Sequence, residues 1–380
     1  MRLTVYTDYV YHRRGDVIYA ERAFALFLAE LASSFEELTI VGRLAPGGEA
    51  ARYALPRAIR FVPLPYYESL ARPLEVLRAT YRSMARFRRV VDDSDVFWLL
   101  GPSPFAVAFS GLVLAHRKRL VLGVRQDYPA YIRARHPGRP MIQLAGLMLE
   151  GAFRTLARIT PVIAVGPQIA RRYCRAKRLL EINVSLTERA DVISESLALE
   201  RSYEGERRVL SVGRLDEEKN PLMLADVLAR LREDGEEWKL IICGEGPQQG
   251  ALAARLRDLG VEDSAEIRGY LPYDDGLQEL YRSSHALLHV SWTEGMPQVI
   301  NEAFAAGLPT IATRVGGIEE AVGPAARLIS PGDPDEAARE LRAIVSDEAL
   351  RLKLIRLGRE WALERTAERE RSRVGEFLSR

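Results

Sequence analysis

The sequence predicts an α/β protein of two consecutive domains, each a doubly wound parallel sheet covered by helices. The chain has 380 residues, more than one hydrophobic core ordinarily serves. Short β-rich runs alternate with amphipathic helical stretches, which is typical of parallel sheets. The alternation starts afresh after a polar, irregular segment. We therefore expect domains at 1–190 and 207–355, a linker at 191–206, and a helical tail at 356–380 that packs back on the first domain.

The elements of both series can be assigned from their periodicity. Strands have β-branched runs, and helices have apolar positions three and four residues apart. In the first domain the expected strands are 3–8, 38–43, 59–64, 96–100, 119–125 and 161–166, with helices at 21–35, 74–91 and 141–158. In the second domain the expected strands are 208–214, 239–246, 265–271, 286–292 and 308–314, with helices at 221–234, 249–260 and 299–307. Two such sheets predict paired Rossmann-like domains facing a central cleft.

Composition bounds the class of protein. A content of 47% hydrophobic and 28% charged residues is that of a soluble globular chain. The first residues lack the apolar segment of a signal peptide, and the most apolar stretch, 105–115, is about half of the roughly 20 residues that span a bilayer. Cys174 and Cys243 match no metal-ligand spacing. We expect both to be buried side chains of a protein in a reducing compartment. These features predict a cytoplasmic protein.

Charge is divided unevenly along the chain. Residues 1–200 hold 29 Lys and Arg against 19 Asp and Glu, whereas residues 201–380 hold 25 against 33. Such a split fits two domains with different partners, the first of them facing something anionic. Ordinary variation in solvated surface charge explains it equally well, and both interpretations stay open.

Three segments at strand ends carry candidate chemistry. The first is SVGRLDEEKNP, with Gly213, Arg214 and Lys219. Glycine permits a tight turn after the strand, and the guanidinium and ammonium groups together suit a diphosphate. The alternative is a solvated turn in which Lys219 pairs with Asp216 or Glu217.

The second segment is SWTEGMPQVINEAFAAGLP. Glu294 ends a strand, and Gly295, Met296 and Pro297 lead into a helix whose first turn, with Gln298, offers free amides to phosphates. Glu302 lies inside that helix among apolar residues, where an unpaired carboxylate would be costly, and it can accept hydrogen bonds from a vicinal diol such as a ribose.

Paired glycine turns form the third segment. CGEGP contains Gly244 and Gly246, and RVGG contains Gly316 and Gly317. A lone GxG is weak evidence for a ligand site. No GxGxxG with a downstream acidic partner occurs near the N-terminus, which argues against a dinucleotide-dependent dehydrogenase.

Taken together, these motifs resemble the donor-binding domain of the GT-B retaining glycosyltransferases of family 4. The resemblance is strong over 208–323 and rests on VLSVGRL followed by a lysine, GEGP, IRGYLP and the E-x7-E pattern EGMPQVINE. It implies that Arg214 and Lys219 contact a nucleotide diphosphate and that Glu294 binds the transferred sugar. Glu302 would hold the ribose. The remaining implied donor contacts are Gly213, Gly244, Tyr270, Leu271, Gly295, Met296, Pro297 and Gln298.

The N-terminal half departs from that family pattern. Where many members have a Gly-Gly loop after the first strand, this chain has Gly15 followed by Asp16. Where many have a histidine near the sugar, this chain offers Arg125, Gln126 and Asp127, and we expect Asp127 to assist at the reacting carbon. His136 lies nearby in a turn.

An acceptor is expected on the basic first domain. Arg78, Arg82, Arg86 and Arg89 follow helical spacing, and a second basic cluster covers 171–178. Such a helix can lie on an anionic membrane, or it can be a core helix with a solvated arginine face. We expect a glycan or lipid-linked acceptor, peripheral contact with the inner face of the membrane, and no nucleic acid partner.

The predicted activity is transfer of a hexosyl group from a UDP-, GDP- or ADP-sugar to an acceptor hydroxyl with retention of configuration. The resemblance implies no cofactor and no metal, and no DxD motif sits at a strand end. Two alternatives remain: a sugar-nucleotide epimerase on the same fold, and a non-catalytic sugar-nucleotide-binding protein.

Overall fold

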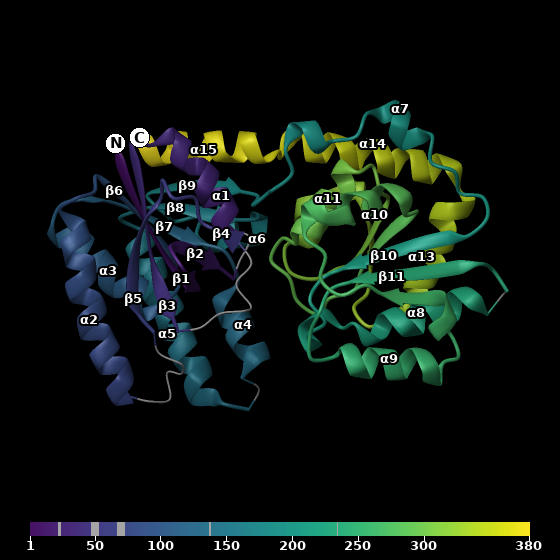
Figure 1. Cartoon of the computed structure of the whole chain (residues 1–380), viewed down its shortest axis with the longest axis horizontal. Coiled ribbons are helices and arrows are strands. Elements are labelled where there is room, and N and C mark those ends of the chain that lie inside the picture. The colour runs from purple at the N-terminus through teal and green to yellow at the C-terminus, as the bar shows by residue number, and fades with distance from the viewer. Residues whose placement is uncertain (22–23, 47–52, 67–72, 137, 234) are drawn as a thin grey trace. The chain divides into compact units, whose positions relative to one another are not determined.

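The computed structural model describes residues 1–380 apart from 22–23, 47–52, 67–72, 137 and 234, with the backbone alone at 73–78, 134, 274 and 275. The chain forms two compact units (Figure 1). Unit 1 contains Met1–Leu186 and Glu368–Arg380, and unit 2 contains Thr187–Ala367. Both are α/β units with the two-domain architecture expected from the sequence.

Unit 1 is built on a nine-stranded sheet. Its parallel strands lie in the order β5-β3-β1-β6-β7-β8-β9, and β2 and β4 add an antiparallel margin beside the far end of β1. The bounds are β1 Arg2–Arg14, β2 Val17–Ala20, β3 Glu37–Ala45, β4 Tyr53–Ala54, β5 Arg60–Pro65, β6 Val96–Gly101, β7 Arg119–Val124, β8 Pro161–Val165 and β9 Arg178–Ile182. Because the chain winds from the centre first to one edge and then to the other, the parallel strands have doubly wound order.

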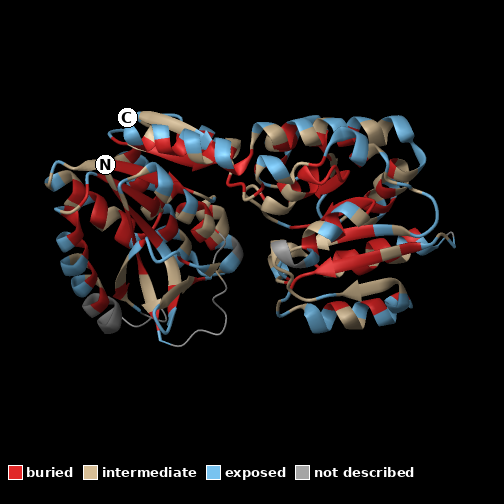
Figure 2. Cartoon of the chain, turned by 45° about the horizontal axis from the view of Figure 1, so that its top comes forward, coloured by how far each residue is buried: buried red, intermediate tan, exposed pale blue. Residues whose placement is uncertain are grey.

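Helices cover both faces of this sheet, and the strands between them are largely buried (Figure 2). One face packs Phe24, Phe27 and Leu28 of α1 against β1 and β6, and the other packs Phe87 and Phe109 of α2 and α3 against the same strands. The bounds are α1 Phe24–Leu31, α2 Pro73–Val91, α3 Pro104–Ala115, α4 Tyr128–Arg135, α5 Pro140–Ala157, α6 Pro167–Arg172 and α15 Ala367–Ser379.

Unit 2 has a six-stranded parallel sheet in the order β12-β11-β10-β13-β14-β15. Its strands are β10 Arg207–Val212, β11 Trp238–Cys243, β12 Ala265–Ile267, β13 Ala286–His289, β14 Thr310–Thr313 and β15 Arg327–Ile329. Its helices are α7 Glu195–Leu199, α8 Leu222–Arg232, α9 Gln249–Asp258, α10 Gln278–Ser283, α11 Gln298–Ala305, α12 Ile318–Val322, α13 Pro334–Ser346 and α14 Glu348–Glu364. Helices α8, α9 and α13 cover one face, and α10, α11 and α12 cover the other.

Segment 191–206, expected to be a linker, lies within unit 2. Ile193 and Ala198 are buried against Ile355, and the Ile193 amide donates to the Ala305 carbonyl at 2.8 Å. These two apolar positions anchor an otherwise polar segment, so the first unit ends at Leu186.

The C-terminal tail divides between the units. Helix α14, which includes the first part of the predicted tail, belongs to unit 2. Helix α15 lies against unit 1, where Val374 and Leu378 join the core. Arg371 pairs with Glu30, and Arg373 donates to the Glu181 carbonyl at 2.8 Å.

Candidate functional site

The sheet of unit 2 changes winding direction between β10 and β13. In doubly wound sheets ligands bind outside the carboxyl ends of the strands at this switch point. The loops that follow these two strands meet there, since the Trp292 amide donates to the Glu218 carbonyl at 2.9 Å. A small pocket between the loops is lined by Gly213, Arg214, Lys219, His289 and Ser291.

Glu294 is the centre of this site. Its Oε1 atom accepts hydrogen bonds from Lys219 Nζ at 2.5 Å and from Ser291 Oγ at 2.8 Å, and it lies 2.8 Å from His289 Nε2. The Glu294 side chain is 8% exposed. A buried carboxylate is held here by an ammonium, a hydroxyl and an imidazole from two loops.

The partners of Glu294 decide its protonation. Burial on its own would raise the pKa of the carboxyl group, but the hydrogen bond and charge of His289, together with the charge of Lys219, outweigh burial and hold the pKa at about 2. Glu294 is therefore ionised at neutral pH. Because all three contacts involve Oε1, Oε2 remains an acceptor that these residues do not use.

Sequence reasoning missed His289 and Ser291. His289 is the last residue of β13, whose four residues are all buried, and Ser291 lies two residues beyond the strand. An imidazole that ends an otherwise apolar strand is a signal that could have identified His289, because buried polar groups need partners.

Arg214 and Lys219, the two cations of the loop after β10, have separate environments. Lys219 contacts Glu294, whereas Arg214 is half-exposed and pairs with Asp216 and Glu218. The alternative in which Lys219 pairs with Asp216 or Glu217 is therefore wrong: Arg214 takes Asp216, and Lys219 reaches across to the next loop.

Glu302 lies inside α11 as expected, but it is not unpaired. The Tyr281 hydroxyl of α10 donates to Glu302 Oε2 at 2.7 Å. Burial raises the pKa of Glu302 to about 7, and the Tyr281 hydrogen bond opposes the rise only in part. Two neighbouring helices bring this pair together, so spacing along the sequence could not reveal it.

The turn before α11 presents free backbone amides. Helix α11 begins at Gln298, and Pro297 is its N-cap residue with extended backbone rather than a member of the first turn, where the sequence had placed it. No side chain caps this end. The first N–H groups of a helix have no intrahelical partner and carry partial positive charge, so they suit an anion.

Glycines let the loops of the site approach each other. Gly244 has φ +155°, and a Cβ there would lie 1.7 Å from the Gly213 carbonyl oxygen. Gly316 has φ +59°, and a Cβ there would lie 1.9 Å from the Glu294 carbonyl oxygen. Gly244 thus packs the β10 and β11 loops together, and Gly316 positions the backbone of Glu294.

Tyr270 and Leu271 follow β12 in unit 2. The Tyr270 amide donates to Glu245 Oε1 at 3.4 Å, and Leu271 packs against the apolar cluster that includes Cys243 and Leu277.

Cys243 is buried as expected, whereas Cys174 is exposed, because it lies in the turn after α6 rather than in the core.

Asp127 lies in unit 1, and its carboxylate is held by hydrogen bonds from a backbone amide and an arginine. Its carboxylate caps α4 by accepting from the Ala130 amide at 3.1 Å and receives both guanidinium nitrogens of Arg172 at 2.6 Å. Nearby Arg125 stacks over Phe24 at 4.1 Å, and burial lowers its pKa to about 10.

The other candidate site residues of unit 1 lie in the β1–β2 turn and on helix α2. Gly15, with φ +57°, and Asp16 form the two-residue turn between β1 and β2. On α2, Arg82 is exposed and Arg86 donates to the Pro63 carbonyl at 2.6 Å, while the side chain of Arg78 lies outside the described residues.

Within the described parts of the chain, no helix is long and apolar enough to cross a membrane, and no cluster of three or more His, Cys, Asp or Glu could hold a metal ion.

Comparison with known proteins finds similarity over the residues that form this site. Residues 193–361 match the family model for glycosyl transferases group 1. The chain is 27% identical over 276 residues to 2-deoxystreptamine glucosyltransferase of Streptomyces kanamyceticus, covering 70% of this chain and 69% of that protein. In the other curated relatives the match covers a smaller share of the relative, 13–57% of its own length.

Solved structures extend the likeness to the whole chain. Anabaena HepE in complex with UDP aligns with a TM-score of 0.70 at 18% identity, covering 100% of both chains. WaaG, a glycosyltransferase involved in lipopolysaccharide biosynthesis, aligns with a TM-score of 0.73 at 16% identity, covering 99% of each chain. The chain therefore has the GT-B fold of two parallel-sheet domains, and its second unit matches the glycosyl transferases group 1.

Proposed function

We propose that this protein is a retaining glycosyltransferase that moves a hexosyl group from a nucleoside diphosphate sugar to an acceptor hydroxyl without a metal ion. The observation that carries the proposal is the ionised, buried Glu294 held by Lys219, His289 and Ser291 at the switch point of unit 2. The group 1 match over 193–361 and the UDP complex of HepE support the donor class.

Each donor group finds a complementary partner in unit 2. The ionised Glu294 accepts hydrogen bonds from hydroxyls of the transferred sugar through Oε2. Phosphate oxygens meet the amides of 295–298 at the start of α11. Lys219 and Arg214 neutralise the diphosphate, and Arg214 exchanges its Asp216 and Glu218 partners for phosphate oxygens. The backbone at 270–271 meets the base.

Ribose binding would use Glu302. A vicinal diol donates two hydrogen bonds to an ionised carboxylate, and Tyr281 already donates one to Oε2. Since burial raises the pKa of Glu302 to about 7, donor binding would favour the ionised form and release protons near neutral pH.

The transfer reaction would need little general acid or base catalysis from side chains. In front-face transfer the departing diphosphate accepts the proton of the attacking hydroxyl, so the bond to the leaving oxygen breaks as the new glycosidic bond forms on the same face. The protein contributes positioning and charge stabilisation through Lys219 and Arg214. Asp127 stays our candidate in unit 1 for assisting at the reacting carbon.

The acceptor would be a glycan or a lipid-linked glycoconjugate bound by basic unit 1. The role of WaaG in lipopolysaccharide biosynthesis supports a glycoconjugate acceptor. Cytoplasmic location with peripheral membrane contact belongs to the same proposal, as do binding roles for Gly15, Asp16, Arg82 and Arg86.

A thermal-shift screen with UDP, GDP, ADP and their sugars tests the donor class. The true donor should raise the melting temperature of unit 2, because ligand that binds only the folded state stabilises it. NMR of the product made from that donor should show the anomeric configuration of the donor. An inverted product would overturn retention, an epimerised nucleotide sugar would identify an epimerase, and binding without turnover across an acceptor panel would favour a non-catalytic protein.

A further inference from the structure

Helix α5 exposes an unusual amount of apolar surface. In the described part of the chain, ten large hydrophobic side chains are exposed, and six of them lie on α5 or two residues beyond its end. Met141 is 77% exposed and Met148 is 69% exposed. Single exposed hydrophobic residues are ordinary, whereas a concentration of them marks an interaction surface.

The exposed residues form one continuous face. Met141, Leu144 and Met148 are three and four residues apart, which places them on one side of the helix. The same spacing continues to Gly151 and Thr155, which line a pocket of about 240 Å³ at the C-terminal end of the helix. The apolar face of α5 therefore leads directly to this pocket.

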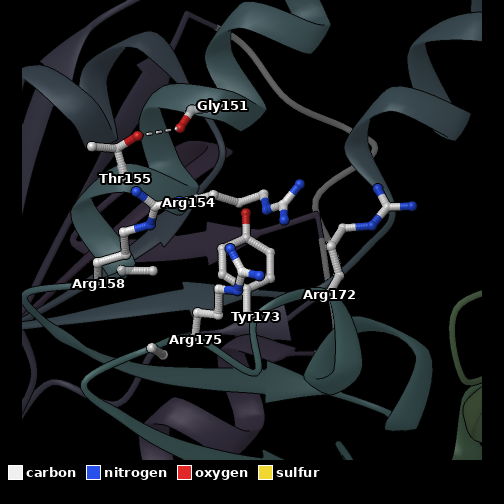
Figure 3. Close-up of a pocket in the computed structure, with 9 residues that line it drawn as sticks. Gly151, Arg154, Thr155, Arg158, Arg172, Tyr173 and Arg175 are labelled. Carbon is white, nitrogen blue, oxygen red and sulfur yellow. Dashed lines mark hydrogen bonds between the residues drawn. The ribbon is translucent and has the colours of Figure 1, made fainter.

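Arginines surround the pocket. Figure 3 shows Arg154, Arg158, Arg172 and Arg175 arranged about Tyr173. Arg172 is neutralised by Asp127. The other three are exposed, and their guanidinium groups form no hydrogen bond and no ion pair of 4 Å or less with another described residue. Three guanidinium groups are thus available to a ligand.

The acidic side chain of Glu150 lies close to these arginines and is buried. Glu150 lies on α5 within the influence of Tyr173, Arg172 and Arg154, and it is 5% exposed. Burial raises the pKa of Glu150, and Arg172 and Arg154 oppose the rise in part. The pocket has the character of an anion site, and guanidinium forks match phosphate oxygens.

We propose that the pocket binds the phosphate of an anionic membrane lipid while the apolar face of α5 enters the acyl boundary. A basic site that ends an apolar helix face complements an amphiphile with an anionic head and an apolar body. Helix α2 fits less well: Arg86 is turned to the Pro63 carbonyl, and Tyr81 is the only large hydrophobic side chain exposed among the described residues of that helix. The inference rests on the peripheral membrane contact of the proposed function and deepens it, because it assigns that contact to α5 and to an anionic lipid, and it does not depend on the donor site.

Vesicle sedimentation with the full chain tests it. Vesicles of phosphatidylcholine, with or without three parts in ten of phosphatidylglycerol, are compared at low and high salt. One variant carries Arg154→Gln, Arg158→Gln and Arg175→Gln. A second carries Met141→Gln, Leu144→Gln and Met148→Gln. The matched control, called the α2 control, removes the same charge through Arg88→Gln and Arg89→Gln at the end of α2 and Arg117→Gln after α3. All six arginines and the three apolar residues are exposed, so melting temperatures should stay near that of the wild type.

The wild type should bind the anionic vesicles, and the α5 arginine variant should bind roughly a hundredfold more weakly at low salt, from about fivefold for each basic residue. The apolar variant should lose at least tenfold, and the α2 control should change less than threefold. Failure of the wild type to bind, or equal losses in the α5 arginine variant and the α2 control, would overturn the proposal.

Two further outcomes identify a different occupant. If inorganic phosphate stabilises the wild type but not the α5 arginine variant, and vesicles fail to bind, the ligand is free phosphate and the lipid is rejected. A wild-type dimer that the apolar variant dissociates, seen by light scattering, assigns the α5 face to a second copy and also rejects the lipid.

Discussion

Replacing Glu302 with glutamine should stabilise unit 2 at alkaline pH. The amide has the same shape, carries no charge, and can still accept the Tyr281 hydroxyl. The pKa of Glu302 rises from 4.5 to about 7, which corresponds to about 3 kcal/mol at about 1.4 kcal/mol per pH unit. Because the folded state binds this proton more tightly than the unfolded state, wild-type stability falls as pH rises from 4.5 through 7. The gain from Glu302→Gln should therefore be about 3 kcal/mol at pH 8.5 and less than about 0.5 kcal/mol at pH 4.5.

Urea unfolding followed by tryptophan fluorescence measures this gain. Three of the four tryptophans, Trp238, Trp292 and Trp361, lie in unit 2, so the signal reports mainly on that unit. Glu360→Gln, at an exposed position of α14, is the matched control and should change stability by less than about 0.5 kcal/mol at either pH. A Glu302→Gln protein no more stable than the wild type at pH 8.5 would refute the reasoning that burial disfavours this carboxylate.

Two other perturbations test the site. Gly316→Ala should lower donor turnover at least tenfold in a transfer assay, because the new Cβ forces the Glu294 carbonyl to move; unchanged turnover would mean that the position of Glu294 is not set by this contact. Between pH 4.5 and 2, the wild type should lose about 3 kcal/mol of unfolding free energy as Glu294 takes up a proton, since its folded pKa of about 2 lies below its ordinary value. Glu294→Gln should flatten that part of the pH profile, and a profile as steep as that of the wild type would contradict the assignment.

Much of the fold could be predicted because strand ends and helix periods are local. The five strands expected in unit 2 are all present, and the order that places β10 beside β13 follows from doubly wound topology. Strands β2, β4, β9 and β15 were missed. They are short or lie at sheet margins, where half-exposed residues blur the alternation of apolar and polar positions.

The site could be predicted where each residue stands in a strand-end motif. Glu294 and Lys219 were identified in this way, and the structure joins them by a direct hydrogen bond. The partners His289 and Tyr281 were not found, because their contacts depend on how two loops and two helices meet in space. The predicted boundary between the domains differs from the observed one for a similar reason. In the sequence Ile193 and Ala198 are isolated apolar residues in a polar stretch, and only the fold shows that Ile355 packs against them.

Equilibrium binding of the matching nucleoside diphosphate and its sugar to the wild type and to Glu294→Gln tests the central claim most directly. If Glu294 accepts hydroxyls of the sugar, the substitution should weaken sugar-nucleotide binding at least tenfold and change nucleoside diphosphate binding by less than about threefold, because a lost charged hydrogen bond is worth about 1.5 kcal/mol or more. Equal changes for both ligands, or none for the sugar nucleotide, would contradict the account.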